Sequence, residues 1–351
     1  MSGKTPFDVV VVGAGQAGLA TGFHLGRRGV HYEILEARPT IGQQWRDRWD
    51  SLRLFTPARY SHLPGLPLPL AGGEYPTKDQ FADYLESYAS RFQLPVRTGV
   101  SVTSVRTGAD GFELMTSAGP LQASRVVVAG GPHANPRIPA QAASLDPAIL
   151  QLHSSTYRNP DQLPEGDVVV VGAGTSGAEI ALELAQAGRR TYLAGRPTPH
   201  IPDPVLRFAG PVYWAFVNHV LTLRTPIGRK VAAGFTNRGA PLIRVSMEQV
   251  RAAGVTTLDR LTDTRDGMPV FGDQTVGRPA ALVWATGFRP DLGWLPSIPV
   301  TPGGWPVTRR GLVDPVPGLA FVGLPFQYSL TSGLIGGVGR DAAFVAQALA
   351  P

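Results

Sequence analysis

Residues 8–18 of the 351-residue chain read DVVVVGAGQAG, which is the most informative pattern in the sequence. The four valines predict a buried strand, and the helical pattern Leu19–Arg28 that follows the turn is closed by Gly29. Three glycines spaced Gly-x-Gly-x-x-Gly allow a tight bend, a close approach of the backbone to a pyrophosphate, and close packing of the helix. The stretch therefore predicts the βαβ opening of a dinucleotide-binding unit.

The pattern occurs a second time at residues 167–177, which read DVVVVGAGTSG. A helical pattern at Ala178–Ala187, closed by Gly188, comes next. A further strand is expected after each copy, at His31–Glu36 and at Thr191–Ala194. Two such openings predict an α/β protein that contains two Rossmann-like dinucleotide-binding domains.

The two copies differ in the residue that should meet a ribose. Glu36 lies 18 residues after Gly18, where a carboxylate can accept hydrogen bonds from ribose hydroxyls. The same count from Gly177 reaches Gly195, and Arg196 is next. Loss of the carboxylate removes repulsion, and a guanidinium can pair with a 2′-phosphate, so the second site is expected to prefer NADPH over NADH. The economical redox couple for two different dinucleotide sites is FAD with a nicotinamide.

The composition excludes several other kinds of site. The chain has no cysteine, which removes disulfides, thiolate metal sites, cysteine nucleophiles and thiol redox relays. The formal net charge is +6, but the basic residues are scattered, so an anionic dinucleotide is expected as ligand and a nucleic acid is not. His200, Asp203 and His219 lack metal-ligand spacing, and no metal site is predicted.

The length predicts two domains, and the longest apolar stretch is too short to span a bilayer. That stretch runs from Gly210 to Leu223 and is interrupted by Asn218 and His219. We expect a cytoplasmic enzyme. The oligomeric state, a homodimer included, stays open.

Between the two copies, Trp45–Pro76 is interpreted as loops, Thr77–Phe92 as an amphipathic helix, and the Pro-rich stretch Ala134–Pro164 as a linker. Residues 200–245 form an apolar insertion dotted with arginines, which is expected to be helical in part and either covers a substrate channel or fills a core. Strands are expected within 96–128, ending at 284–287 and at 319–323, and a closing helix is expected at 333–349.

Several further segments resemble those of a known family. Residues 42–46, which read GQQWR, are similar to a Gly-Gly-x-Trp segment beside a flavin, and Leu54–Pro57 and Tyr75-Pro76 match neighbouring segments. Ala285–Asp291 is similar to an Ala-Thr-Gly-Tyr-x-x-Asp segment, and residues 321–325 followed by 336–341 look like bacterial single-chain members. The chain resembles the two-dinucleotide-binding flavoproteins, in their flavin-containing monooxygenase-like branch. This resemblance implies an FAD-binding domain at residues 1–160 and 284–351, interrupted by an NADPH-binding domain at 161–283.

The chain departs from the family pattern at two places. His153 and Tyr157 fit a signature whose Phe and Gly positions hold Pro147 and Ile149 here, and His153 is interpreted as a linker histidine. The position before Thr56 holds Phe55, where eukaryotic-type members have an Asn beside the nicotinamide and the flavin. Phe55 is therefore predicted to line the reaction centre without offering it a hydrogen bond.

The activity implied by the resemblance is that of an NADPH-dependent FAD monooxygenase. NADPH would reduce the flavin, and O2 would add at C4a to give a hydroperoxyflavin. One oxygen atom would then pass to a small thioether, amine or ketone. The alternative is an NADPH-dependent flavoprotein reductase or diaphorase that passes electrons to a quinone, a metal or arsenical, or a protein carrier. A non-enzymatic redox sensor is a third class. The stretch Ser329–Ser332 could cap the closing helix and aim it at the flavin.

The predicted contacts follow from these motifs. For FAD they are Gly13, Gly15, Gln16, Ala17, Gly18, Glu36, Gln44, Trp45, Thr56, Leu330 and Thr331. For NADPH they are Gly172, Gly174, Thr175, Ser176, Gly177 and Arg196.

Overall fold

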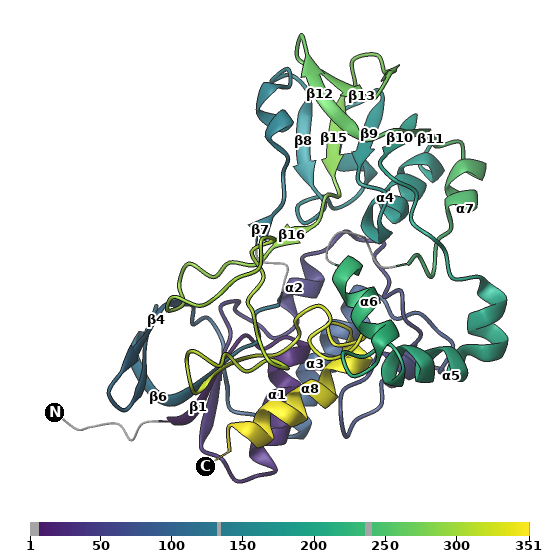
Figure 1. Cartoon of the computed structure of the whole chain (residues 1–351). Coiled ribbons are helices and arrows are strands. Elements are labelled where there is room, and N and C mark those ends of the chain that lie inside the picture. Colours follow the sequence, from purple (N-terminus) through teal and green to yellow (C-terminus); the bar gives the residue numbers. More distant parts are fainter. Residues whose placement is uncertain (1–6, 132–134, 236–240, 351) are drawn as a thin grey trace.

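The protein is described by a computed structural model over residues 7–131, 135–235 and 241–350. Two sheets built around parallel strands form two lobes, joined by two short segments that pair with each other (Figure 1). These joining segments are β7 (Asn135–Pro136) and β16 (Phe288–Arg289), which run antiparallel. The predicted α/β architecture with two Rossmann-like units is confirmed.

The first sheet has seven strands in the order β3-β2-β1-β6-β5-β4, with β17 beside β6. Its strands are β1 (Phe7–Val12), β2 (Tyr32–Leu35), β3 (Val96–Arg97), β4 (Val102–Gly108), β5 (Gly111–Thr116), β6 (Gly119–Val128) and β17 (Leu319–Phe321). The valine strand β1 is parallel to β2 and β6, and β17 is parallel to β6. A strand from the end of the chain therefore completes the sheet that its beginning starts.

The second sheet repeats the same opening in the order β11-β10-β9-β15-β8. Its strands are β8 (Leu150–His153), β9 (Val168–Val171), β10 (Thr191–Ala194), β11 (Thr256–Leu258) and β15 (Ala281–Trp284). All of its pairings are parallel. A small antiparallel sheet lies beside it, made of β12 (Leu261–Arg265), β13 (Met268–Phe271) and β14 (Gln274–Thr275).

The four helices with predicted bounds lie close to their expected ranges. They are α1 (Gln16–Gly26), α2 (Gln43–Arg46), α3 (Lys78–Arg91), α4 (Thr175–Gln186), α5 (Asp203–His219), α6 (Pro226–Phe235), α7 (Met247–Ala252) and α8 (Ile335–Ala348). The predicted amphipathic helix is confirmed as α3, which Thr77 and Gln80 cap reciprocally. Both helices after the glycine turns begin three residues before the predicted patterns, because the last residues of each turn are already helical.

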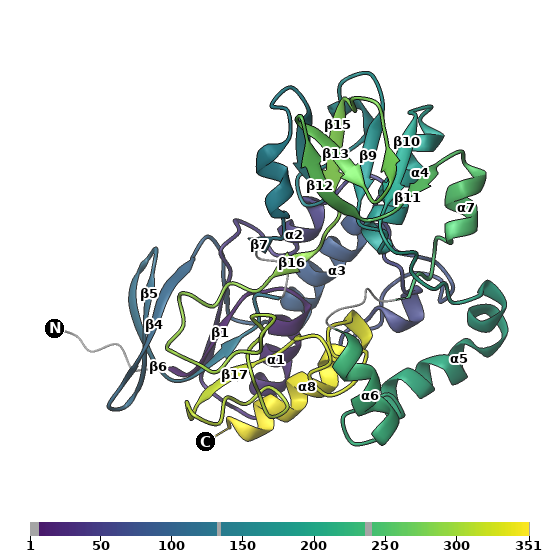
Figure 2. The same cartoon turned by 45° about the horizontal axis from the view of Figure 1, so that its top comes forward.

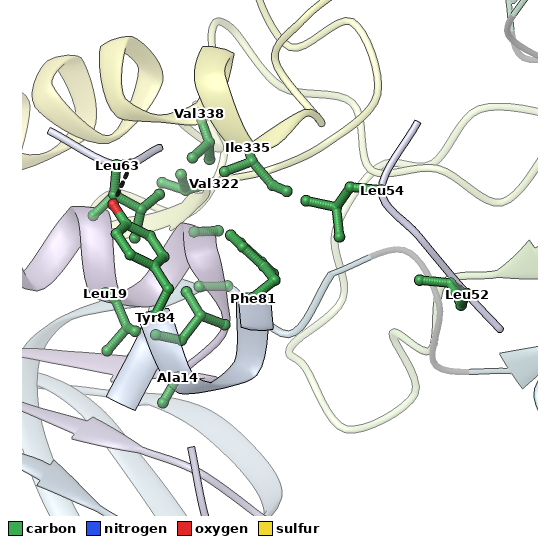
Figure 3. Packing of buried hydrophobic residues seen from close by; sticks show 14 of the residues in the cluster. Ala14, Leu19, Leu52, Leu54, Leu63, Phe81, Tyr84, Val322, Ile335 and Val338 are labelled. Carbon is green, nitrogen blue, oxygen red and sulfur yellow. Dashed lines mark hydrogen bonds between the residues drawn. The ribbon is translucent and has the colours of Figure 1, made fainter. Parts of the chain in front are cut away.

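A core of apolar side chains fixes the first glycine turn in place. Ala14 of the turn, Leu19 of α1, Phe81 of α3 and Ile335 of α8 belong to one buried cluster (Figure 3). The Tyr84 hydroxyl in this core accepts from the Leu63 backbone N–H at 2.7 Å and donates to the Leu66 carbonyl at 2.7 Å. The loop after α2 is thus anchored to α3, which restricts how far it can move from the turn.

The Pro-rich stretch 134–164 is more than a linker. Residues 132–134 lie outside the described part, but the stretch contains β8, and Ile149 and Tyr157 are buried. Because β8 pairs with β15, the second sheet begins before residue 161. The division into residues 1–160 with 284–351 and residues 161–283 stays a prediction.

Candidate functional site

The first glycine turn has a geometry that side chains would block. Gly13 has φ of +104°, and a Cβ there would lie 2.8 Å from the Ala129 carbonyl oxygen. A Cβ on Gly18 would lie 1.8 Å from the Gly13 carbonyl oxygen. Gly15 precedes α1 as its N-cap and provides no side-chain cap, so the first N–H groups of this helix are available to an anion.

Glu36 stands at this turn, where the sequence predicts an acid. Its two carboxylate oxygens accept from the Ala14 backbone N–H at 2.8 Å and from the Arg38 backbone N–H at 2.9 Å. The strand end is tied to the turn as well, since the Gly13 N–H donates to the Leu35 carbonyl at 2.7 Å. Each carboxylate oxygen can accept a further hydrogen bond, so Glu36 can also bind hydroxyls.

The second turn reproduces the backbone of the first. Gly172 has φ of +114°, and its N–H donates to the Ala194 carbonyl at 2.8 Å. A Cβ on Gly177 would lie 1.7 Å from the Gly172 carbonyl oxygen. Gly174 differs, because a Cβ there would meet no atom within 4 Å. The turn therefore has open space beside Gly174, at the start of α4, where Thr175 and Ser176 form its first residues.

The residue that corresponds to Glu36 is Gly195, directly after β10. Its φ is +141°, and a Cβ on it would lie 3.0 Å from the Ala173 backbone nitrogen. This backbone conformation disfavours any side chain, including a carboxylate. Arg196 follows and is exposed, which leaves its guanidinium accessible at the edge of the turn.

The predicted flavin contacts from the next segment take different roles. Gln44 reaches over the first turn, since its Nε2 lies 2.6 Å from where a Cβ on Gly15 would be. Trp45 packs edge-on against Phe81, and its buried Nε1 has no hydrogen-bond partner within the described part of the chain. Thr56 is buried, and its hydroxyl shares a 2.6 Å hydrogen bond with Ser61. Thr56 therefore has a structural role in this loop.

The segment before α8 is bound to α5. Thr331 shares a hydrogen bond between its hydroxyl and the Asn218 side-chain oxygen, and the Leu330 N–H donates to the Leu221 carbonyl at 3.0 Å. The predicted cap is wrong: Leu334 is the N-cap of α8 and makes no side-chain cap bond. The Ser332 hydroxyl instead accepts from backbone N–H groups of its own loop, because that loop turns back before the helix begins.

Phe55 lines a small apolar cavity of about 40 Å³. The same cavity is lined by the predicted residues Leu330 and Thr331. It is also lined by residues that the sequence did not single out, namely Tyr213, Trp214, Val217, Phe235, Pro241, Ile243 and Leu334. Among the described residues that line it, none is charged. The insertion at residues 200–245, apart from residues 236–240 outside the described part, thus both covers this cavity and packs as a core with Phe55.

His153 has a structural role in β8. Its Nε2 lies 3.1 Å from the Gly287 carbonyl oxygen, its Nδ1 lies 2.9 Å from the Ser155 hydroxyl, and its ring meets Phe288 edge-on. Burial lowers the pKa of His153. The ring therefore ties β8 to the segment after β15.

A buried ion pair lies one turn beyond the second glycine motif. Arg244 Nη2 is 3.0 Å from a carboxylate oxygen of Glu179 on α4, and the Glu179 side chain is 4% exposed. Burial raises the pKa of Glu179 to about 7, although Arg244 opposes this shift. The end of the insertion is thereby attached to the helix that carries the second turn.

Replacing Glu179 with glutamine should change how stability depends on pH. Folded protein holds the Glu179 proton up to a higher pH than the unfolded chain does. The free energy of unfolding therefore falls as pH rises from about 4.5 to about 7. Glu179→Gln lacks this fall. The unfolding free energy of the variant minus that of the original protein should therefore rise by about 2 kcal/mol between about pH 5 and pH 8. Denaturant titrations at several pH values measure it, with Glu248→Gln at an exposed site on α7 as control. If the difference in unfolding free energy between the two proteins stays constant over this pH range, the raised pKa of Glu179 is refuted.

The described ranges hold neither a candidate metal cluster nor a candidate membrane span. Among residues 7–131, 135–235 and 241–350, no group of three His, Asp or Glu side chains could hold a metal ion. In the same ranges, no helix is long and apolar enough to cross a membrane.

Comparisons with known proteins agree with this geometry. The model of the pyridine nucleotide-disulphide oxidoreductase family matches residues 10–207. An uncharacterized CzcO-like oxidoreductase of Geobacillus kaustophilus is 39% identical over 342 residues, which cover 96% of this chain and 97% of that protein. A flavin-containing monooxygenase from Stenotrophomonas maltophilia is similar in structure, with a TM-score of 0.80 and 27% identity over 99% of this chain and 98% of that one. The indole-3-pyruvate monooxygenase YUCCA1 of rice is 36% identical over 202 residues, 55% of this chain and 48% of that protein.

Proposed function

The chain belongs to the pyridine nucleotide-disulphide oxidoreductase family, as a flavin-containing monooxygenase-like flavoprotein, and on that premise we propose that it is an NADPH-dependent FAD monooxygenase. Its substrate is a small, uncharged thioether, amine or ketone that receives one oxygen atom of O2. The observation that carries the proposal is the pair of glycine turns with the same backbone and opposite ribose-side residues, Glu36 in one and Gly195-Arg196 in the other.

The first turn fits FAD. The uncapped start of α1 offers N–H groups to a pyrophosphate, and Glu36 accepts hydrogen bonds from ribose hydroxyls. The Gln44 side chain lies over Gly15, and because it is flexible it can withdraw when a ligand binds. Trp45 Nε1, which has no partner among the described residues, offers one more donor. Bound FAD would supply the hydride acceptance and the oxygen activation that side chains lack.

The second turn fits NADPH. The start of α4 and the open space at Gly174 suit a pyrophosphate, and Arg196 is placed to pair with a 2′-phosphate. Residues 1–160 with 284–351 would then bind FAD and residues 161–283 would bind NADPH. Because NADPH is an intracellular reductant, the proposal also places the protein in the cytoplasm.

The cavity at Phe55 supports an oxygen transfer to an apolar substrate. The described residues of its lining are uncharged, which favours an uncharged substrate and the exclusion of water from the site. Its volume of about 40 Å³ is too small for most substrates, so α5 or α6 must shift when one binds.

The activity is tested by accounting for each product. Purified protein loaded with FAD is given NADPH, O2 and a panel of uncharged thioethers, amines and ketones. We expect at least one of these substrates to yield an oxygenated product in step with NADPH consumption, with little hydrogen peroxide. NADPH oxidation that yields only peroxide, or that proceeds without O2 when a quinone is added, would point to the reductase instead.

Replacing Glu36 with alanine should weaken FAD binding. The change removes the carboxylate that would accept from the ribose and that orients the Ala14 N–H, so the dissociation constant should rise about tenfold to a hundredfold. The flavin-to-protein ratio after gel filtration measures this loss. Glu113→Ala, at an exposed position on β5, should keep the ratio of the original protein. Full flavin content in Glu36→Ala would count against the assignment of the first site.

A further inference from the structure

One side of the insertion exposes an unusual number of apolar side chains. Seven large ones within 23 residues are exposed, and only four others are exposed in the rest of the described chain. The seven, called the apolar stripe here, are Val205, Phe208, Val212, Phe216, Val220, Leu223 and Ile227. Four of them, Val205, Phe208, Val212 and Phe216, follow one another in α5 at spacings of three or four residues. Val220 and Leu223 lie in the turn after α5, and Ile227 lies in the first turn of α6. Val212 is 72% exposed, and an apolar surface of this kind on a protein indicates a contact with something else.

The apolar stripe is not part of the core. Trp214 and Val217 of the same helix are buried and line the cavity at Phe55. Figures 1 and 2 both show α5 at the outer edge of the molecule. Helix α5 bends at Ala209 and continues through Pro211. Its exposed side faces away from the rest of the molecule. Helix α5 therefore has one apolar side toward the cavity and another toward the exterior.

Cations lie at the α6 end of the apolar stripe. Between Asp203 and Glu248 the sequence holds no acidic residue and six lysines and arginines, of which Arg244 is paired with Glu179. Arg224, Arg229 and Lys230 are exposed next to the end of the stripe. Arg229 donates to the backbone carbonyls of Leu223 and Arg224, which leaves its charge without a neutralising carboxylate in that contact. An apolar surface with cations at its edge complements a partner whose apolar interior is bordered by negatively charged groups.

We propose that the apolar stripe docks on an anionic lipid bilayer, with α5 and α6 lying in its interface. Aliphatic and aromatic side chains enter the boundary of the acyl chains, and the cations meet lipid phosphates. A second copy of this chain is a poorer occupant, because it would bring two cationic surfaces together. With 17 residues, α5 lies along the bilayer and does not cross it.

This contact would place the cavity beside the bilayer. The buried side of α5 lines the cavity and its exposed side would touch lipid, so apolar compounds dissolved in the bilayer would have a short route to Phe55. That consequence rests on the proposed function, whereas the docking itself does not.

Vesicle sedimentation tests the docking without any measurement of activity. The full-length protein is mixed with vesicles of equimolar phosphatidylcholine and phosphatidylglycerol, and with vesicles of phosphatidylcholine alone. We expect binding to the anionic vesicles that weakens as salt is added. Val212→Glu should lower the vesicle partition coefficient by about tenfold or more, because it puts a charge into the apolar stripe.

Val307→Glu is the matched control, since Val307 is 47% exposed and lies outside the insertion. It makes the same chemical change and should bind vesicles like the original protein. Arg229→Gln with Lys230→Gln should weaken binding to anionic vesicles only. Circular dichroism checks that each variant is folded.

Three results would overturn the proposal. The first is no binding to anionic vesicles, and the second is equal binding by Val212→Glu. The third is that the original protein does not bind vesicles and forms a stable dimer in light scattering, which Val212→Glu converts to a monomer. That last result would assign the apolar stripe to self-association. Because none of these measurements involves FAD or NADPH, each outcome is independent of the proposed oxygenase activity.

Discussion

Replacing Gly18 with alanine is expected to yield a protein that is strongly destabilised and that retains no FAD. The new Cβ would lie 1.8 Å from the Gly13 carbonyl oxygen, a backbone atom that cannot move without opening the turn. Opening it would also move the Ala14 N–H away from Glu36. We expect a loss of at least about 3 kcal/mol in the free energy of unfolding. Denaturant titration of the flavin-free protein and the flavin-to-protein ratio after reconstitution measure the two effects.

Gly234→Ala is the matched control for this substitution. Gly234 lies in α6, and a Cβ on it would meet no atom within 4 Å, so alanine should leave the stability equal or higher by up to about 1 kcal/mol. If Gly18→Ala had the stability and the flavin content of the original protein, the first turn would not be the site that we describe.

Replacing Arg196 with alanine is expected to remove the preference for NADPH over NADH. If the guanidinium pairs with the 2′-phosphate, its loss costs ~1.5–3 kcal/mol, and KM for NADPH should rise about tenfold or more. NADH lacks the phosphate, so its KM should hardly change. Steady-state oxidation of NADPH and of NADH at varied concentrations, with O2 as the electron acceptor, gives both KM values without an organic substrate.

Arg190→Ala serves as the comparison for Arg196→Ala. Arg190 lies at the other end of β10, where its Nε is 3.8 Å from an Asp167 carboxylate oxygen in an exposed pair. We expect the ratio of the two KM values to stay as in the original protein. Equal effects of Arg196→Ala on NADPH and NADH would show that another group reads the phosphate.

The sequence predictions that rest on short local patterns agree best with the structure. The four valines and three glycines of each turn specify a buried strand, a bend and a helix start within a dozen residues, and the structure has all of them. The spacing of 18 residues also placed Glu36 and Gly195 directly after β2 and β10, because a short helix between two parallel strands can vary little in length. The site contacts assigned to these residues stay predictions until ligands are measured.

Features that depend on distant pairings were harder to predict. His153 looked like part of a linker because its surroundings are rich in proline, yet β8 is completed by β15, more than a hundred residues later. The cavity brings Phe55 together with Trp214 and Ile243, and no local pattern connects these segments. The insertion at residues 200–245 is helical in part, as the sequence predicts, but the exposed apolar side chains along α5 were not singled out from the sequence. The Ser329–Ser332 loop looked like a cap because it precedes a helix, whereas its hydroxyls bond to their own loop and to α5.

Anaerobic titration of the reconstituted protein with NADPH decides whether one chain binds FAD at the first turn and NADPH at the second. We predict a yellow protein with one FAD per chain whose flavin absorbance is bleached by one equivalent of NADPH. A protein that stays colourless after incubation with FAD, or a bound flavin that NADPH leaves oxidised, would contradict the account.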